Sequence, residues 1–423
     1  MATRTLDNGL RVVVSSTRGP GVVAVNIWYD VGSRHEEPHR QGFAHLFEHL
    51  MFQGSRHVKS GDHFALLQGH GASLNATTSF DRTNYFEAMP AGVLDLALWL
   101  EADRMAYLDD VLTQQNFRNQ VDVVAQERSQ RMDNVPYGTV FEKALPLIFD
   151  VEHPYGHLPI GNMSHLAEAT LAEVSDFHAT YYMPNNAVLS IVGDVNEDDA
   201  FAKADRYFAH VAAAEAPKRE LPSALPPVAV PQRADYAEDV PAPAVWLAMR
   251  LPVKAPASRE LAATSLAVSI IGEGETSRLH RRLVRQDEVA LAAGMGVNAL
   301  IAGNSLGLAS IRALPGSDLD DALDAYRDVL ERFAADGPSP DELAVARAQA
   351  ERDWLDEMGT AAGRADAISE AALLFDDPEV LNERLPLLRS ITAQEVQEAA
   401  ETWLLSSLNA QVRITAAEED AVA

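Results

Sequence analysis

PHRQGFAHLFEHLMFQG, residues 38–54, is the stretch from which the rest of the fold can be worked out. Its large apolar residues recur at i, i+3, i+4 and i+7 and so form one stripe along a helix: Phe43, Leu46, Phe47 and Leu50. Pro38 suits a first helical turn and Gly54 suits a C-terminal stop. The pattern therefore predicts an amphipathic helix over residues 38–54.

The polar face of this helix carries His45, Glu48 and His49. Two imidazoles one turn apart can both reach one divalent ion, and nitrogen ligands suit zinc. Glu48 lies beside the ion rather than on it, where a general base takes a proton from metal-bound water. The spacing is H-x-x-E-H, the inverse of H-E-x-x-H. Chance is the alternative in a chain with 13 His, but the polar face of a regular amphipathic pattern favours a metal site.

The composition is typical of a soluble globular protein. The 423 residues are enough for two domains, and 47% hydrophobic with 23% charged residues is an ordinary soluble globular balance. No apolar run approaches the ~20 residues of a membrane span. A net charge of −28 argues against nucleic acid or an anionic membrane as partner. The chain has no Cys, which excludes disulfides and thiolate metal ligands.

The N-terminus gives an expectation about the compartment. No apolar leader follows Met1-Ala2-Thr3-Arg4. The chain as written is therefore expected to be soluble and cytoplasmic, or periplasmic if a leader has been removed.

Strand and helix patterns alternate along the chain and then repeat. Residues 5–31 are predicted to form a hairpin of strands 11–15 and 22–29, and strands are also expected over 72–79, 83–88 and 187–193. Further helices are expected over residues 61–69, 94–105, 113–132, 171–182 and 197–208.

A proline-rich stretch separates two similar patterns. Prolines are too dense over residues 216–234 for a helix or central strand, which predicts a linker. Beyond it, residues 244–250 resemble strand 22–29, and a helix over 258–271 without His takes the place of the His45 helix. We expect an α+β fold of two homologous halves, 1–215 with the zinc site and 235–423 without one. The alternative is that any two α+β halves look alike at this level.

Two His leave a catalytic zinc site one protein ligand short. Glu127 is the best third ligand, because it lies well past His49 on a separate helix, the one predicted over 113–132. It shares a face of that helix with Gln120, two turns earlier. Glu101 and Glu87 are rivals, and spacing alone does not choose among the three.

Together, several motifs resemble the pitrilysin family of inverted-motif zinc peptidases, which includes processing peptidases. They are HLFEH (45–49), FQGS (52–55), NATTSFDRTNY (75–85), VVAQER (123–128), PYG (154–156), YYMPNN (181–186), VGDV (192–195) and SRL (277–279). The resemblance runs nearly end to end.

The resemblance implies two homologous halves, each a mostly antiparallel sheet covered by helices. It implies one zinc ion on His45, His49 and Glu127, with Glu48 as base and proton shuttle. It also implies that the strand with Leu74, Asn75 and Ala76 takes an extended peptide by β-addition. For Asn75 the alternative is simple strand termination.

The chain departs from the family pattern at two places. Family members often carry a Glu where this chain has Gln120, an outer neighbour of the zinc ligands, so zinc affinity or a local pKa is expected to differ. In the C-terminal half the family usually has an Arg and a Tyr that hold the substrate carbonyl. Here Arg285 is kept, but Ala292 stands where the Tyr would be.

The missing pair predicts a second homologous subunit that supplies it, either a different chain or a second copy of this one. The sequence thus predicts a zinc metalloendopeptidase subunit that cleaves unfolded peptides or small proteins. One alternative is a non-catalytic structural subunit of a complex, which typically lacks an intact motif. The other is a different metal hydrolase with the same three ligands.

Overall fold

The computed structural model describes residues 1–19, 21–215, 217–219 and 221–417, and it contains two compact units. Unit 1 combines Met1–Glu127, His157–Glu220 and Asp353–Leu381, and unit 2 combines Arg128–Gly156, Leu221–Arg352 and Asn382–Ala423. Each unit has one β-sheet and its own hydrophobic core, so the fold is α+β. In the described part of the chain, no helix combines the length and apolar character that a membrane span requires.

The sheet of unit 1 has six strands in the order β1-β2-β6-β3-β5-β4. The strands are Ala2–Thr5 (β1), Arg11–Ser16 (β2), Val22–Tyr29 (β3), Ser73–Thr78 (β4), Thr83–Pro90 (β5) and Ala187–Gly193 (β6). Neighbours are antiparallel except β2 and β6, which are parallel. β4 therefore lies at an edge of the sheet.

The pairing predicted for residues 5–31 is wrong, although the strands lie where expected. β6 lies between β2 and β3 and pairs with both, while the antiparallel neighbour of β2 across the Asn8-Gly9 turn is β1. Both β2 and β3 have nearly continuous buried runs, which is typical of strands in the middle of a sheet rather than of a two-stranded ribbon.

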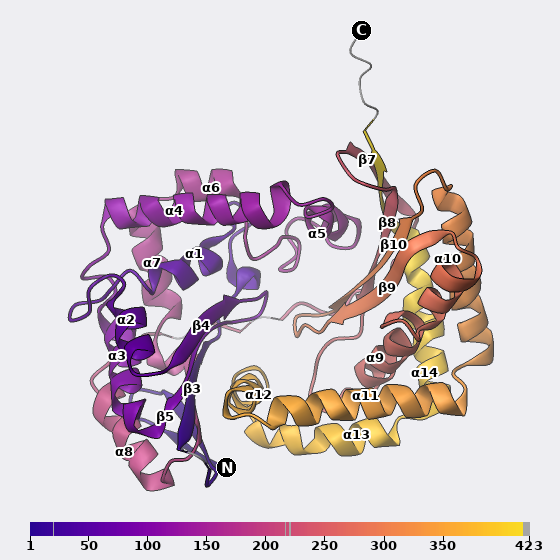
Figure 1. The fold of residues 1–423 in the computed structure, drawn as a ribbon. Helices are drawn as coiled ribbons and strands as arrows, with labels where there is room; N and C mark the ends of the chain where they lie inside the picture. Colours follow the sequence, from indigo (N-terminus) through magenta and orange to yellow (C-terminus); the bar gives the residue numbers. More distant parts are fainter. Residues whose placement is uncertain (20, 216, 220, 418–423) are drawn as a thin grey trace. The chain divides into compact units, whose positions relative to one another are not determined.

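Helices cover both faces of this sheet. The helices of unit 1 from the first half of the sequence are Phe43–Leu50 (α1), Asp62–Gly69 (α2), Leu94–Tyr107 (α3), Gln114–Arg128 (α4), Met163–Glu168 (α6), Leu171–Tyr181 (α7) and Glu197–Phe208 (α8). On the opposite face, α12 (Ala361–Leu374) packs against β3 and β6 (Figure 1).

The sheet of unit 2 repeats this topology with five strands in the order β7-β11-β8-β10-β9. They are Gln232–Glu238 (β7), Ala244–Leu251 (β8), Ala290–Asn298 (β9), Ser305–Ala313 (β10) and Ala410–Ala416 (β11). β7 and β11 are parallel, as β2 and β6 are in unit 1, and the other neighbours are antiparallel. The longer helices of unit 2 are Arg259–Gly272 (α9), Leu319–Asp336 (α10), Arg384–Ser390 (α13) and Ala393–Ala399 (α14). Pro340–Met358 (α11) begins in unit 2 and ends in unit 1. Two halves of one topology are thus present, as predicted.

The compact units differ from contiguous halves because the repeats exchange a helix. In unit 2, α5 (Val140–Ala144) packs against β8 and β11, although it precedes the proline-rich stretch. In unit 1, α12 packs against β3 and β6, although it follows that stretch. The predicted boundaries, 1–215, 216–234 and 235–423, concern homologous halves and stay a prediction. They do not describe the compact units.

Candidate metal and catalytic site

The helix that carries both His residues is shorter than predicted. α1 spans Phe43–Leu50, and the whole predicted apolar stripe is buried in the core of unit 1. The helix cannot begin at Pro38, because Gly42 has a φ of +98°, in the left-handed region. It ends at Leu50 in a turn, and Gly54 has a φ of +103°.

A buried carboxylate fixes the start of α1. Glu36 accepts hydrogen bonds from the backbone N–H of Gly42 (2.7 Å) and Ala44 (2.8 Å), two donors at the N-terminus of the helix. The Nε2 of His157 lies 2.9 Å from the same carboxylate. Burial raises the pKa of Glu36, while His157 and the two amides oppose this rise. The helix is therefore anchored independently of any ligand.

The structure brings His45, His49 and Glu127 together. Glu127 Oε2 lies 3.6 Å from His45 Nε2 and 3.2 Å from His49 Nε2, and one possible ligand atom from each residue lies within 4.8 Å of the others. The two imidazole rings are 4.9 Å apart and nearly perpendicular. The side chains are 12%, 22% and 16% exposed, so solvent reaches the cluster.

Glu127 owes its position to the packing of α4. Phe117, Val121 and Val124 are buried at i, i+4 and i+7 and set the face that α4 turns to the core. Glu127 follows Val124 by one turn and remains partly exposed.

These spacings fit a zinc ion. In a tetrahedral site with bonds of 2.0–2.1 Å, neighbouring ligand atoms lie about 3.4 Å apart. The two measured separations lie on either side of that value. Two imidazoles and one carboxylate also form a donor set of catalytic zinc sites, which keep a fourth position for water or substrate.

Glu48 is held from the neighbouring sheet. Thr78 Oγ1, in β4, donates a hydrogen bond of 2.7 Å to Glu48 Oε2. The negative charge of Glu48 also raises the pKa of the buried Tyr85 and Tyr182, though burial is the larger cause for both. Thr78 thus orients a charged carboxylate on the helix that carries the two His.

The predicted peptide-binding strand is the edge strand β4. The Ser79 N–H donates to the Arg82 carbonyl across the turn, and in antiparallel pairs the bonded positions alternate. Leu74, Ala76 and Thr78 therefore turn their backbone N–H and C=O groups away from β5, toward the open edge. The Asn75 side chain lies at this edge as well, because its Oδ1 accepts from the Ala76 N–H at 3.0 Å.

Three other residues were singled out in the sequence, one in unit 1 and two in unit 2. Gln120 lies on α4, two turns before Glu127. Arg285 forms an exposed ion pair of 3.0 Å with Glu275, and Ala292 lies on β9, an edge strand of unit 2. Their predicted roles stay predictions.

The rival carboxylates Glu87 and Glu101 lie in a different cluster. They converge with His63, which lies 3.8 Å from Glu87 and 3.6 Å from Glu101. Arg104 is paired with Glu101 in the same buried group. The structure therefore places neither rival with His45 and His49.

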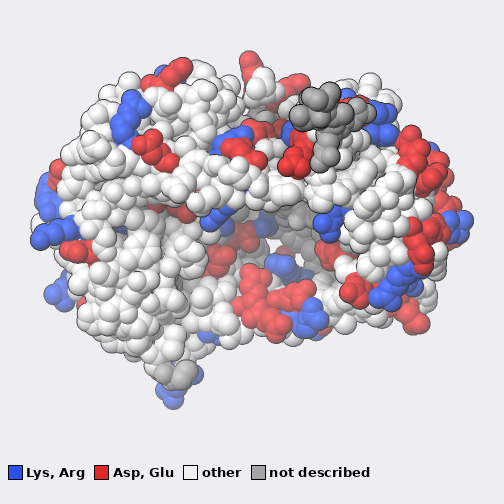
Figure 2. Space-filling model, turned by 45° about the horizontal axis from the view of Figure 1, so that its top comes forward, with Lys and Arg blue, Asp and Glu red and all other residues white. Residues whose placement is uncertain are grey.

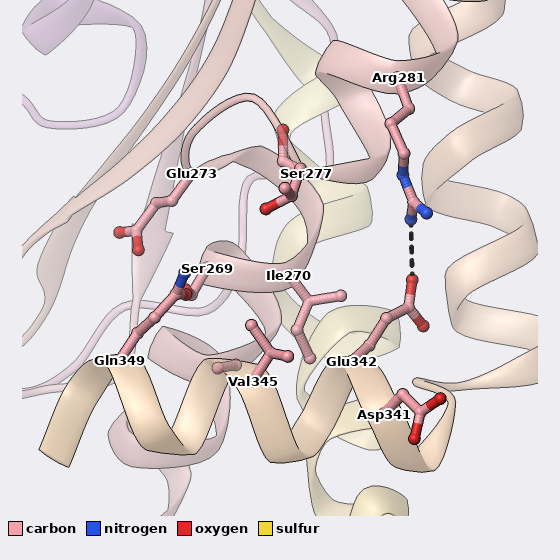
Figure 3. A pocket seen from close by; sticks show the side chains of 11 residues that line it. Ser269, Ile270, Glu273, Ser277, Arg281, Asp341, Glu342, Val345 and Gln349 are labelled. Carbon is pink, nitrogen blue, oxygen red and sulfur yellow. Dashed lines mark hydrogen bonds and ion pairs between the residues drawn. The ribbon is translucent and has the colours of Figure 1, made fainter. Parts of the chain in front are cut away.

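A pocket of about 200 Å³ in unit 2 contains none of the predicted site residues (Figure 3). One of its acids, Glu342, is bound by Arg278 at 2.7 Å and by Arg281 at 3.2 Å. The hydrogen bond from Arg278 is the main reason that the pKa of Glu342 falls to about 2. These ion pairs already neutralise that acid, so we attach no catalytic role to the pocket.

Charge on the surface agrees with the composition. On the face shown in Figure 2, acidic and basic side chains of the described residues are interspersed, and no extended basic patch is visible.

Comparisons with known proteins identify the family. A model of Insulinase (Peptidase family M16) matches residues 11–149, and a model of the Peptidase M16 inactive domain matches residues 168–350. This chain belongs to peptidase family M16. The pitrilysin resemblance is thereby confirmed. The inactive-domain match covers none of His45, Glu48, His49 and Glu127.

Individual relatives of this M16 chain agree. Zinc protease PqqE of Helicobacter pylori is 34% identical over 296 residues, which is 68% of this chain and 64% of that protein. The mitochondrial-processing peptidase subunit beta of Saccharomyces cerevisiae is 26% identical over 215 residues, 51% of this chain and 46% of that protein. Both alignments span less than two thirds of the relative. A crystal structure of a protease from Helicobacter pylori superimposes with a TM-score of 0.89 at 26% identity, covering 98% of this chain and 99% of that chain.

Sequence analysis missed the residues that support the site. Thr78 binds Glu48 across 30 residues, Glu36 binds the start of α1 across 6 residues, and His157 lies against Glu36 across 121 residues. Strand alternation puts Thr78 on the same face as Ala76 and was the one usable signal. For Glu36 and His157 the sequence holds no comparable signal, because tertiary structure alone brings them together.

Proposed function

We propose that this M16 chain is the zinc-bearing subunit of an endopeptidase that cleaves unfolded peptides or small proteins. The observation that carries the proposal is the convergence of His45, His49 and Glu127 at the ligand spacing of tetrahedral zinc, with Glu48 on the same helix. The names of its relatives as zinc proteases support it.

The chemistry divides between the ion and the chain. Zinc held by the three side chains would polarise the scissile carbonyl and acidify water. Glu48 accepts the proton from the attacking water and returns it to the leaving amine. The hydrogen bond from Thr78 keeps the Glu48 carboxylate in one orientation for both transfers.

The substrate enters as an additional strand. The backbone groups of Leu74 and Ala76 face the open edge of β4, so an extended peptide pairs there through main-chain hydrogen bonds. Such pairing is independent of side-chain identity and requires an unfolded segment. On binding, a peptide carbonyl replaces Asn75 Oδ1 as the acceptor of the Ala76 N–H.

A second subunit completes the site in this proposal. With Ala292 in place of the Tyr that the family usually has, the chain lacks one donor for the developing oxyanion, a group worth ~10²–10³ in rate. The name of the mitochondrial-processing peptidase subunit beta shows that one relative works as a subunit. We propose a homologous partner, either a second copy or a related chain, that supplies the Arg/Tyr pair.

Glu48→Gln tests the central claim. The variant should keep one zinc ion per chain and lose peptidase activity by about 10²–10⁴-fold, the usual share of general acid–base catalysis. The assay uses a fluorogenic unfolded peptide on protein purified with its native associated chain, with mass spectrometry and metal analysis of the same sample. Glu168→Gln, at an exposed position at the end of α6, is the matched control and should change neither value.

Each outcome has a clear meaning. Full activity in Glu48→Gln would remove the assignment of the base. Zinc-loaded wild-type protein that cleaves no peptide, alone or with its partner, would instead favour the non-catalytic structural subunit.

A further inference from the structure

The exchanged helix α12 carries one acidic side chain into the sheet of unit 1. Asp366 Oδ1 accepts hydrogen bonds from Asn26 Nδ2 (2.9 Å) and Trp28 Nε1 (3.1 Å) of β3, and from Asn84 Nδ2 (3.2 Å) of β5. All three donor residues are at most 3% exposed. A single carboxylate oxygen therefore satisfies three buried N–H donors on two strands.

The same polar layer continues from β5 to the edge strand. Asn84 Oδ1 accepts from Thr77 Oγ1 of β4 at 2.6 Å, and Asn84 also donates to Asn26 Oδ1 at 3.0 Å. Arg82 Nη1 donates to the Thr77 carbonyl at 2.9 Å. Thr77 is thus held through both its side chain and its backbone.

Asp366 also interacts electrostatically with Arg82. The Arg82 guanidinium lies 4.7 Å over the Trp28 ring, whose Nε1–H is bound by Asp366. Burial lowers the pKa of Arg82, and Asp366 is the foremost of the carboxylates that oppose this shift. The acid therefore steadies both groups that contact Thr77, namely Asn84 and Arg82.

Thr77 lies between the two positions that matter for the edge. Its neighbours Ala76 and Thr78 turn their backbone toward the open edge, and the Thr78 side chain binds Glu48. A shift of Thr77 against β5 would move both neighbours. The register of β4 thus depends on contacts that end at Asp366.

We propose that Asp366 is a positioning residue that fixes the edge strand β4 for peptide addition. A residue from beyond the proline-rich stretch would then control how well the N-terminal half binds its substrate. The inference rests on the proposed peptidase function, because it concerns the binding of the peptide by the same site.

Asp366→Ala should raise KM for an unfolded peptide by about tenfold, the effect expected from loss of a charged hydrogen-bond acceptor. The kcat should change less than KM, and zinc content should stay at the wild-type value. Hydrogen–deuterium exchange should rise in the peptide that spans residues 73–86. Asp366→Asn, which keeps an acceptor oxygen but has no charge, should show the same changes at smaller size and decides the matter if the Ala variant does not fold.

Ser369→Ala is the matched control. It removes the buried hydrogen bonding of the Ser369 hydroxyl, whose Oγ lies 2.8 Å from Ser190 Oγ of β6 and 3.5 Å from the Asn26 carbonyl oxygen of β3. Both partners lie on β6 or β3 rather than on β4 or β5. KM and exchange over residues 73–86 should be unchanged in this variant. Equal effects of the Asp366 and Ser369 variants, or a fall in kcat with constant KM, would overturn the proposal. If the wild type cleaves no peptide, the proposed function fails, and the exchange measurement still decides the role of Asp366.

Discussion

Unit 1 contains two clusters that consist of His and Glu side chains but differ in chemistry. His45, His49 and Glu127 form the first, and His63, Glu87 and Glu101 form the second. In each cluster, one possible ligand atom per residue lies within 4.8 Å of the others. The first has side chains 12–22% exposed, whereas those of the second are at most 5% exposed. Proximity of His and Glu is therefore not sufficient to identify a metal site.

Arg104 accounts for the difference. Its side chain, 2% exposed, is paired with Glu101 and lies 4.1 Å from the centre of the Tyr85 ring. Burial alone would raise the pKa of Glu101, but Arg104 and the hydrogen bond from Glu87 outweigh burial and lower it. Burial, followed by the charge of Glu101, raises the pKa of Glu87 well above its ordinary value.

The second cluster thus balances its own charge. It holds one ion pair, Glu101 with Arg104, and the raised pKa of Glu87 favours the uncharged form of that carboxyl. Burial and Arg104 lower the pKa of His63 to about 3, so this imidazole is neutral at neutral pH. A divalent ion there would lie next to a buried guanidinium. In the second cluster the buried guanidinium of Arg104 therefore supplies the positive charge that a metal ion would otherwise supply.

The largest predicted effect is on zinc binding, which should depend on the first cluster and not on the second. Glu127→Gln removes the carboxylate that we propose as the third zinc ligand, so zinc affinity should fall by more than the ~10–100-fold typical of changes to outer partners of a ligand. Zinc affinity is measured by competition with a chelator, and stoichiometry by native mass spectrometry. The same substitution in the second cluster, Glu87→Gln, should leave both values unchanged. Equal zinc loss in the two variants would contradict the distinction.

A smaller effect is expected on stability, at the second cluster. Arg104→Leu leaves Glu101 buried without its counter-charge, which should lower the free energy of unfolding by about 3–5 kcal/mol. Urea denaturation at fixed excess zinc measures the change. The double variant Arg104→Leu/Glu101→Gln should recover part of the loss, because no buried charge then remains. If the double variant is as unstable as the single one, lost packing on Tyr85 rather than charge is responsible.

Local patterns predicted the parts of this comparison that are local in sequence. The H-x-x-E-H spacing located His45, Glu48 and His49. The helices expected over 61–69, 171–182, 197–208 and 258–271 match α2, α7, α8 and α9 to within about two residues. Glu127 required the family resemblance, because spacing could not separate it from Glu87 and Glu101. What separates them is Arg104 and His63, which meet the two rivals only in the folded chain.

Long-range pairing was the part that the sequence could not predict. Nothing in strands β2 and β3 indicates that β6, more than 150 residues later, lies between them. The exchange of α5 and α12 is equally invisible, since each helix is locally ordinary and only its packing partner is unexpected. Such arrangements depend on the burial of matching faces, which a one-dimensional pattern does not record.

The smallest predicted effect is a pH dependence of folding stability that arises from Glu87 in the second cluster. In the folded state the pKa of Glu87 lies well above its ordinary value of 4.5, so the folded protein keeps a proton that the unfolded chain releases. Stability contributed by this proton is present below about pH 4.5 and declines as the pH rises toward the raised pKa. Gln at position 87 is neutral at every pH and still donates a hydrogen bond to Glu101. Glu87→Gln should therefore gain stability relative to the wild type between pH 5 and 8, by at most about 1.4 kcal/mol per pH unit.

Urea denaturation at several pH values with excess zinc measures this gain, and the acid side supplies an internal control. The pKa of His63 is lowered from 6.5 to about 3, so the unfolded chain binds a proton that the folded state refuses, and stability falls as the pH drops below 6.5. This loss of stability at low pH is due to His63 rather than Glu87, so it should be the same in the wild type and in Glu87→Gln. Parallel stability curves from pH 5 to 8 would mean that Glu87 is ionised when folded. The second cluster would then carry a net negative charge at neutral pH, because Arg104 alone would not balance the charges of Glu87 and Glu101.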